Sequence, residues 1–266
     1  MRAAMTGYDT PGPIRAVLDL SAARLWINAG ARADTQVRID PANPDSPEDV
    51  KAAQRIQADY TEGELTVRGA QGTWGSWLSS GGLAEVVLDL PAGSSLEVRT
   101  SAGDIRAYGR LGDVTAHTSH GEIALTRTGN ARLSTESGGI RLGVARGAVE
   151  LRAPDGDIHV EEVTGELNAG TAGGSITVGR AHAGVTAKTK HGDIRLREVA
   201  TGTVLAETGA GEVEIGLRPG AAAELQLTTR SGTVRDHLGE PDTTPAESTV
   251  LVRATTTHGD ILLRRA

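Results

Sequence analysis

A small or acidic side chain follows a glycine at regular intervals through most of this sequence, and a column of carboxylates could bind a cation. The residues at this position are, in order, Asp104, Glu122, Gly139, Asp157, Ser175, Asp193, Glu212, Thr233 and Asp260. Repeats that bind Ca²⁺ carry a denser Gly-Gly-x-Gly-x-Asp pattern, which is absent here. Because neutral residues also interrupt the column, we expect its carboxylates to lie in solvated turns, and we expect no metal site.

Three histidines occupy the same position of their repeats, directly before the glycine. They are His120, His191 and His258. A metal site would require these imidazoles to converge on one ion. They belong to the second, sixth and ninth repeats, so strands stacked ~4.8 Å apart would hold them well over ~10 Å from one another. We therefore expect exposed turn histidines, with neither metal ligands nor a bound cofactor.

Candidate catalytic groups are plentiful, but none forms a recognisable motif. No serine lies in a Gly-x-Ser-x-Gly motif that would expose a nucleophile. Carboxylate pairs could hydrolyse glycosides, yet only the segments 41–50 and 236–248 could form long loops beside such short repeats. The glycine-rich segments do not precede helices, so a phosphate site is not expected. The sequence therefore predicts no catalytic residues and a protein that is not an enzyme.

Trp74 and Trp77 form the one aromatic cluster that the sequence itself displays, in a chain with only 2% aromatic residues. Exposed tryptophans can anchor a partner protein or a glycan. A tryptophan pair can also cover the open end of a repeat fold. Both interpretations stay open, and Trp74 and Trp77 are the candidate partner-binding residues.

Repeats of about eighteen residues carry most of these side chains. From Leu96 onward, each repeat contains a glycine, a small or acidic residue, and then isoleucine or valine. Apolar residues alternate with polar ones after one glycine, as at Ile176 and Val178, and before the next, as at Val185 and Ala187. Such alternation indicates strands. The fixed period predicts an all-β, parallel β-solenoid (β-helix) with about nine coils of ~18 residues, whose isoleucines point inward.

The beginning of the chain is less regular but still alternates like strands. Ser46 before Pro47 predicts a short helix, and a Glu-Gly turn soon after it predicts a hairpin. Because the end of a solenoid exposes unpaired strand edges, we expect residues 1–83 to form an N-terminal β cap, continuous with regular coils over residues 84–266. Longer spacing between the last repeats predicts an exposed loop over residues 236–248.

Charge and composition exclude several classes of partner. The formal net charge is −7 and the lysines and arginines are scattered, so nucleic acid is not an expected partner. No stretch approaches the ~18 apolar residues of a membrane span. Residues 1–13 contain one arginine and no apolar core, so no secretory signal is recognised. We expect a cytoplasmic protein, or one at the cell surface if the N-terminus is truncated.

The repeat itself points to a family. Residues 118–123 read Thr-Ser-His-Gly-Glu-Ile, and residues 189–194 read Thr-Lys-His-Gly-Asp-Ile. This pattern resembles a bacterial β-strand-repeat family of unknown function, whose members are often labelled "putative adhesin". Residues 49–53, followed by the hairpin around Tyr60, resemble its actinobacterial branch. The resemblance covers nearly the whole chain, implies a β-repeat fold, and supplies no catalytic residues.

Together these features predict a non-enzymatic scaffold or interaction protein. Its partner would be a protein or a glycan, recognised by exposed columns of Arg, Thr, Glu and His on the strand faces. Two alternatives stay open. One is a structural protein that polymerises end to end as a homo-oligomer, and the other is a calcium-dependent surface adhesin.

Overall fold

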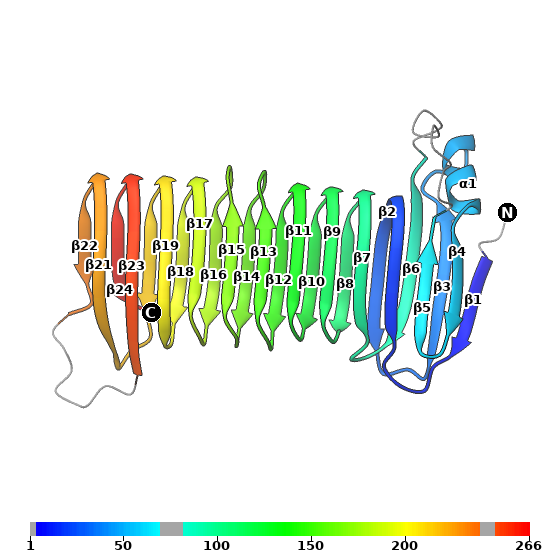
Figure 1. The fold of residues 1–266 in the computed structure, drawn as a ribbon, viewed down its shortest axis with the longest axis horizontal. Coiled ribbons are helices and arrows are strands. Elements are labelled where there is room, and N and C mark those ends of the chain that lie inside the picture. The colour runs from blue at the N-terminus through cyan, green and yellow to red at the C-terminus, as the bar shows by residue number, and fades with distance from the viewer. Residues whose placement is uncertain (1–3, 70–81, 240–247) are drawn as a thin grey trace. The chain divides into compact units, whose positions relative to one another are not determined.

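The computed structural model of the chain describes residues 4–69, 82–239 and 248–266. The chain divides into two compact units, unit 1 (residues 1–128) and unit 2 (residues 129–266). In each unit, successive coils place one strand in sheet A and the next in sheet B, and most neighbouring strands pair in parallel (Figure 1). The predicted fold class, an all-β parallel β-solenoid, is confirmed in both units.

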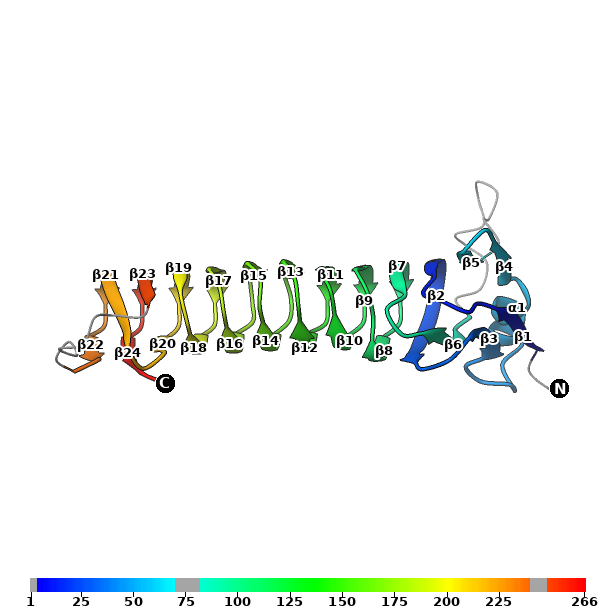
Figure 2. The same cartoon turned by 90° about the horizontal axis from the view of Figure 1, so that it is seen from below.

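Unit 2 contains two parallel sheets whose strands stack in register. In spatial order, the strands of sheet A are β12 (Ile140–Ala145), β14 (Ile158–Val163), β16 (Ile176–Ala181), β18 (Ile194–Val199), β20 (Val213–Leu217), β24 (Ile261–Arg265) and β22 (Val234–His237). Those of sheet B are β11 (Ala131–Ser137), β13 (Val149–Ala153), β15 (Leu167–Thr171), β17 (Val185–His191), β19 (Gly202–Ala210), β23 (Ser248–His258) and β21 (Ala221–Ser231). Figure 2 shows the two sheets of this unit facing each other.

Aliphatic side chains fill the space between the two sheets of unit 2. Ile158 pairs with Ile176, and Ile176 with Ile194, so equivalent isoleucines form one column. Ile176 and Ile194 are 0% exposed, so the isoleucine two residues after the glycine points inward in these coils, as its alternation predicts. Burying one such side chain stabilises the fold by roughly 1.5–3 kcal/mol. Many thin aliphatic layers thus replace the aromatic core that this composition lacks.

A glycine and a threonine shape the corner between the two sheets. At Gly192 φ is 142°, and a Cβ atom there would lie 2.2 Å from the carbonyl oxygen of Gly174 in the preceding coil. That oxygen also accepts a 2.9 Å hydrogen bond from the hydroxyl of Thr189. In the next coil, the hydroxyl of Thr208 donates to the Gly192 oxygen over 2.9 Å. Glycine is required because the backbones of successive coils approach too closely for a side chain.

The last coil in the sequence is not the last coil in space. Strands β23 and β24 lie between the coil β19–β20 and the coil β21–β22, and they pair in parallel with both. The outermost coil of unit 2 is therefore β21–β22. The predicted loop over residues 236–248 is wrong at its edges, because Asp236 and His237 end β22 and Ser248 begins β23; residues 240–247 lie outside the described residues.

Unit 1 contains corresponding sheets, to which antiparallel strands are added. In spatial order, the strands of sheet A are β1 (Ala4–Asp9), β3 (Asp34–Pro41), β6 (Ala84–Pro91), β2 (Arg15–Gly30), β8 (Ile105–Arg110) and β10 (Ile123–Thr128). Those of sheet B are β4 (Gln57–Thr61), β5 (Glu64–Arg68), β2, β7 (Ser95–Ala102) and β9 (Val114–His120). Strand β3 is antiparallel to β1 and β6, and β4 is antiparallel to β5. The division into a cap of residues 1–83 and coils of residues 84–266 stays a prediction.

Strand β2 belongs to both sheets and forms a whole coil by itself. Leu18 and Leu20 point inward from sheet B, and Leu25 and Ile27 point inward from sheet A. The alternation shifts by one residue at Ala22, where the strand turns from one sheet into the other. Because β2 pairs with β5 and β6 on one side and with β7 and β8 on the other, the coils of unit 1 also depart from sequence order.

Helix α1 (Pro47–Gln54) begins where the sequence predicts a helix. The Oγ atom of Ser46 accepts a 3.3 Å hydrogen bond from the backbone N–H of Asp49, and Pro47 occupies the first position. The carboxylate of Asp49 also accepts a 2.9 Å hydrogen bond from the backbone N–H of Leu83, which ties the helix to the segment before β6. Within the described residues, no helix has the length and hydropathy needed to cross a bilayer.

Candidate binding surface

The acidic column is a ladder of hydrogen bonds from side chain to backbone. In unit 2, a carboxylate oxygen of Asp157 accepts from the backbone N–H of Ser175 over 2.8 Å. The hydroxyl oxygen of Ser175 accepts from the N–H of Asp193 over 3.2 Å, and Asp193 accepts from the N–H of Glu212 over 2.9 Å. Each side chain thereby ties its coil to the next. Serine can replace aspartate in the column because both supply an acceptor oxygen at the same reach.

Arginines compensate the charges of this column. In unit 2, Arg195 lies 2.7 Å from a carboxylate oxygen of Asp193, and Arg235 lies 3.2 Å from Asp260. The hydrogen bond from the backbone N–H of Thr233, together with the charge of Arg235, lowers the pKa of Asp260 below its usual value. Across residues 4–69, 82–239 and 248–266, no three His, Asp or Glu side chains are grouped so that they could hold a metal ion.

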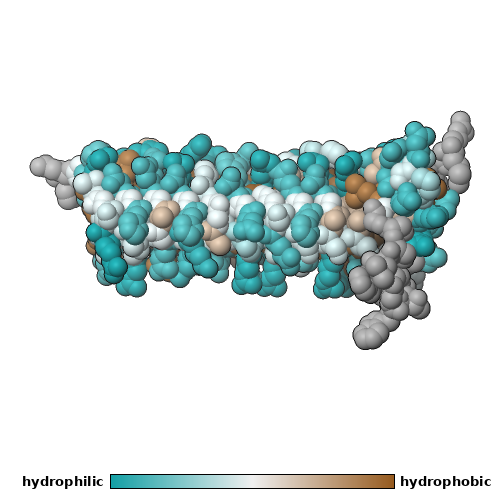
Figure 3. Space-filling view, turned by 90° about the horizontal axis from the view of Figure 1, so that it is seen from above, coloured by the Kyte–Doolittle hydropathy of each residue, from teal (hydrophilic) through white to brown (hydrophobic). Residues whose placement is uncertain are grey.

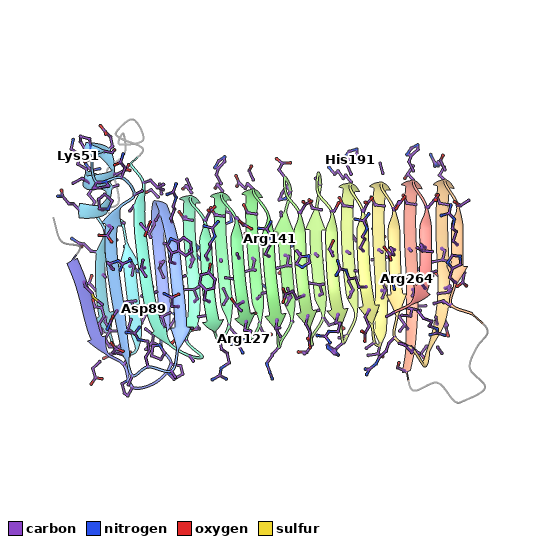
Figure 4. All side chains as sticks on the ribbon, turned by 180° about the vertical axis from the view of Figure 1, so that it is seen from behind. Lys51, Asp89, Arg127, Arg141, His191 and Arg264 are labelled. Atoms are coloured by element: carbon purple, nitrogen blue, oxygen red, sulfur yellow. The ribbon has the colours of Figure 1, made fainter. Side chains whose placement is uncertain are left out.

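The three repeat histidines lie in exposed positions at strand ends. His120 ends β9 in unit 1, whereas His191 ends β17 and His258 ends β23 in unit 2. Figure 4 shows His191 beyond the end of its strand. In unit 2, β19 lies between β17 and β23, so His191 and His258 are separated by two strand spacings, about 10 Å. This is less than the predicted separation, because the coil β21–β22 does not lie between them.

Rows of opposite charges cover the outward strand faces. In unit 2, Glu214 lies 2.8 Å from Arg264 on the next strand of sheet A. In sheet B, Glu150 lies 2.9 Å from Arg132 and 2.6 Å from Arg152. Figure 3, which looks onto the ends of the strands, shows that hydrophilic side chains predominate there as well. Pairs this exposed contribute little to stability.

Two aromatic side chains interrupt this polar pattern in sheet A of unit 1. Trp26 on β2 points outward between the buried Leu25 and Ile27, and Tyr108 on β8 is 48% exposed. Their ring centroids are 6.3 Å apart and the ring planes differ by 9°. The guanidinium of Arg106, directly opposite Trp26 in the strand register, lies 5.2 Å from the Trp26 ring centre. We call Trp26, Tyr108 and Arg106 the Trp26 surface.

Polar side chains flank the Trp26 surface and are held in fixed positions. Asn28, opposite Tyr108 in the strand register, donates a 2.8 Å hydrogen bond to Asp89. Arg32 lies 3.4 Å from the other oxygen of the Asp89 carboxylate. Arg106 is itself paired with Asp104 at 2.9 Å. The surface therefore offers aromatic area within a rim of ordered hydrogen-bonding groups.

The predicted candidates Trp74 and Trp77 lie outside the described residues, so their role stays a prediction. The Trp26 surface was not predicted, although the sequence indicates the direction of one of its side chains. Trp26 alternates with the inward residues of its strand, so it must point outward. Its contact with Tyr108 depends on the insertion of β2 beside β8, which no local pattern reveals.

The sequence model of one family, described as Toastrack DUF4097, matches residues 15–264. The chain belongs to this family. The expected membership of a β-strand-repeat family is thereby confirmed, and the actinobacterial branch stays a prediction. No curated protein matches the sequence significantly.

Solved structures resemble the chain along nearly its whole length at low identity. A "putative adhesin" from Bacteroides fragilis is 12% identical, with a TM-score of 0.46 over 98% of this chain and 97% of that one. A "putative adhesin" from Parabacteroides merdae is 11% identical, with a TM-score of 0.45 over 100% and 96%. A "putative lipid binding protein" from Parabacteroides distasonis is 12% identical, with a TM-score of 0.37 over 97% and 96%. Such values carry no argument about what this chain binds.

Proposed function

We propose that this chain is a non-enzymatic interaction protein and that the Trp26 surface binds a partner protein. The observation that carries this proposal is the exposed Tyr108 ring beside Trp26, whose own ring lies under the Arg106 guanidinium, on a strand face that is mostly polar. Tryptophan, tyrosine and arginine are the residues that most often dominate the binding energy of protein interfaces. Two neighbouring β-strands hold the three side chains in place, so little conformational entropy is lost on binding.

The surroundings of the charged residues support a role without catalysis. In the acidic column, the carboxylates of Asp193 and Asp260 each accept a backbone hydrogen bond and pair with an arginine. Catalytic acids and bases instead tend to gather in a cleft with their pKa values shifted toward the working pH. Here the pKa of Asp260 shifts away from neutrality, as expected for a structural carboxylate.

A partner captured at the Trp26 surface would test this function. A photoreactive amino acid placed at Tyr108 should crosslink one protein in cells of the native host, and the same group at Thr115 on β9 should not. Binding of that purified protein is then measured with the full chain. We expect Trp26→Ala and Tyr108→Ala to weaken binding at least about tenfold, which is ~1.4 kcal/mol.

Thr115→Ala is the matched control, because Thr115 is exposed on sheet B of the same unit. It should leave the dissociation constant unchanged, and circular dichroism should show that all three variants fold. Equal affinity of Trp26→Ala and the unmodified chain would refute the proposal. Binding to a polysaccharide that Trp26→Ala abolishes, without a crosslinked protein, would assign the surface to glycans instead.

A further inference from the structure

The outermost coil of unit 2 leaves a long strand edge open. Strand β21 has 11 residues and, within the described residues, pairs only with β23. Strand β22 likewise pairs only with β24 in this part of the chain. Figures 1 and 2 both show β21 and β22 as the outermost described strands of this unit. The free N–H and C=O groups of such an edge are a template for another strand.

The interior positions of this coil are also uncovered. Leu225 and Leu227 are only partly buried, and Val234 is 44% exposed. Their partners in the neighbouring coil include Val252, opposite Leu225, and Ile261, opposite Val234. Both partners are 0% exposed. The coil β21–β22 therefore presents an apolar layer that one more coil would bury.

The outward face of β21 carries opposite charges at symmetric positions. Glu224 lies three residues before Leu227, and Arg230 lies three residues after it. Both are exposed, and within the described residues neither is in an ion pair. If a second copy of β21 runs antiparallel to the first about Leu227, each Glu224 lies opposite the Arg230 of the other copy. Opposite charges at directly facing positions stabilise an antiparallel pair.

We propose that β21 forms the centre of a closed homodimer, in which the two copies pair edge to edge about a two-fold axis at Leu227. The same register sets Leu225 opposite Thr229 and Leu227 opposite its own copy. The inward face of one strand therefore continues into the inward face of the other, and the charged outward faces are continuous as well. Such an interface uses the same surface of both chains and closes after two copies, whereas a head-to-tail contact would continue into a filament. The strand also lacks proline and lysine, which commonly block open edges.

Charge reversal tests the proposed register. Light scattering after size exclusion should give twice the 27.5 kDa mass of one chain at micromolar concentration. Glu224→Arg and Arg230→Glu each place like charges opposite each other, so each should raise the dissociation constant at least about tenfold. The double variant restores both pairs and should dimerise like the unmodified chain. A monomeric unmodified chain, filaments, or a double variant no better than either single variant would overturn the proposal.

An engineered disulfide tests the position of the two-fold axis. The chain contains no cysteine, so an introduced thiol can pair only with its own copy. Leu227→Cys places one thiol opposite its own copy, within the Cα separation that a disulfide spans. Oxidation should therefore convert this variant to a covalent dimer on a non-reducing gel. The matched control Ala222→Cys lies on the same strand, but its copy would be about 33 Å away along the strand. Absence of the Leu227→Cys dimer, or equal crosslinking of both variants, would refute this axis.

Discussion

Positions in the coils of unit 2 differ sharply in the side chains that they tolerate. Gly192 leaves no room for a Cβ atom, whereas a Cβ atom at Gly170 on β15 would have no other atom within 4 Å. Ile176 is fully buried, whereas Thr177 beside it points outward along the same strand. Each contrast therefore offers a test substitution and a control that introduce the same residue type at two positions with different surroundings.

Gly192→Ala should destabilise the protein by about 2–4 kcal/mol, because it combines a positive φ with a contact of 2.2 Å to the Gly174 oxygen. Gly170→Ala should be neutral or slightly stabilising, because it reduces only the entropy of the unfolded chain. Urea unfolding of both variants measures the difference. Equal midpoints would show that the corner has room for a methyl group.

Ile176→Asp should cost several kcal/mol, because it buries an unpaired charge in the aliphatic column. Thr177→Asp should change the free energy of unfolding by less than about 1 kcal/mol, because its side chain reaches solvent. Thermal melts followed by circular dichroism compare the two. A melting curve of Ile176→Asp that matches the unmodified chain would contradict the inward placement of Ile176.

One carboxylate, that of Asp260, links strand β22 to the neighbouring strand β24. The carboxylate of Asp260, just before β24, accepts from the backbone N–H of Thr233 over 2.8 Å and pairs with Arg235 on β22. These contacts tie the outermost coil of unit 2 to its neighbour. The attachment of β22 should therefore depend on whether Asp260 is ionised.

Acid should weaken this attachment. The folded pKa of Asp260 lies below its ordinary value of 3.8, so its stabilising effect is complete above pH 3.8 and is lost as the pH falls through the folded value. Asp260→Asn keeps an acceptor oxygen and carries no charge, so its urea midpoint should fall less between neutral pH and about pH 3. Asp45→Asn, in an exposed loop, is the control and should follow the unmodified chain. Parallel pH curves for all three proteins would contradict this role.

Coil order is a property of the whole molecule, and cysteine pairs can test it. Thr203 on β19 lies opposite Leu251 on β23, and Leu251 lies opposite Glu224 on β21. Cysteines at 203 and 251 should therefore form a disulfide, whereas cysteines at 203 and 224 are two strands apart, about 10 Å, and should not. Mass spectrometry of the oxidised double variants distinguishes the pairs. Efficient crosslinking of 203 to 224 would instead indicate coils stacked in sequence order.

Local signals in the sequence predict much of the fold and little of the candidate surface. The alternation around Ile176, the capped helix at Ser46 and the outward direction of Trp26 all follow from residues near them in the chain. The contact of Trp26 with Tyr108 joins residues of β2 and β8 that are distant in sequence. No periodicity within either strand identifies its partner, so this contact could not be predicted.

The amino-acid sequence by itself determined the strands, the period of the coils and the residues that face inward, because each depends on alternation within a few neighbouring residues. Only the tertiary structure decided that β2 lies beside β8 and that the coil β23–β24 is stacked between β19–β20 and β21–β22. The physical reason is that the coils carry similar aliphatic columns and similar backbone edges. Any coil could therefore pair with several others, and the choice among them depends on packing over the whole unit.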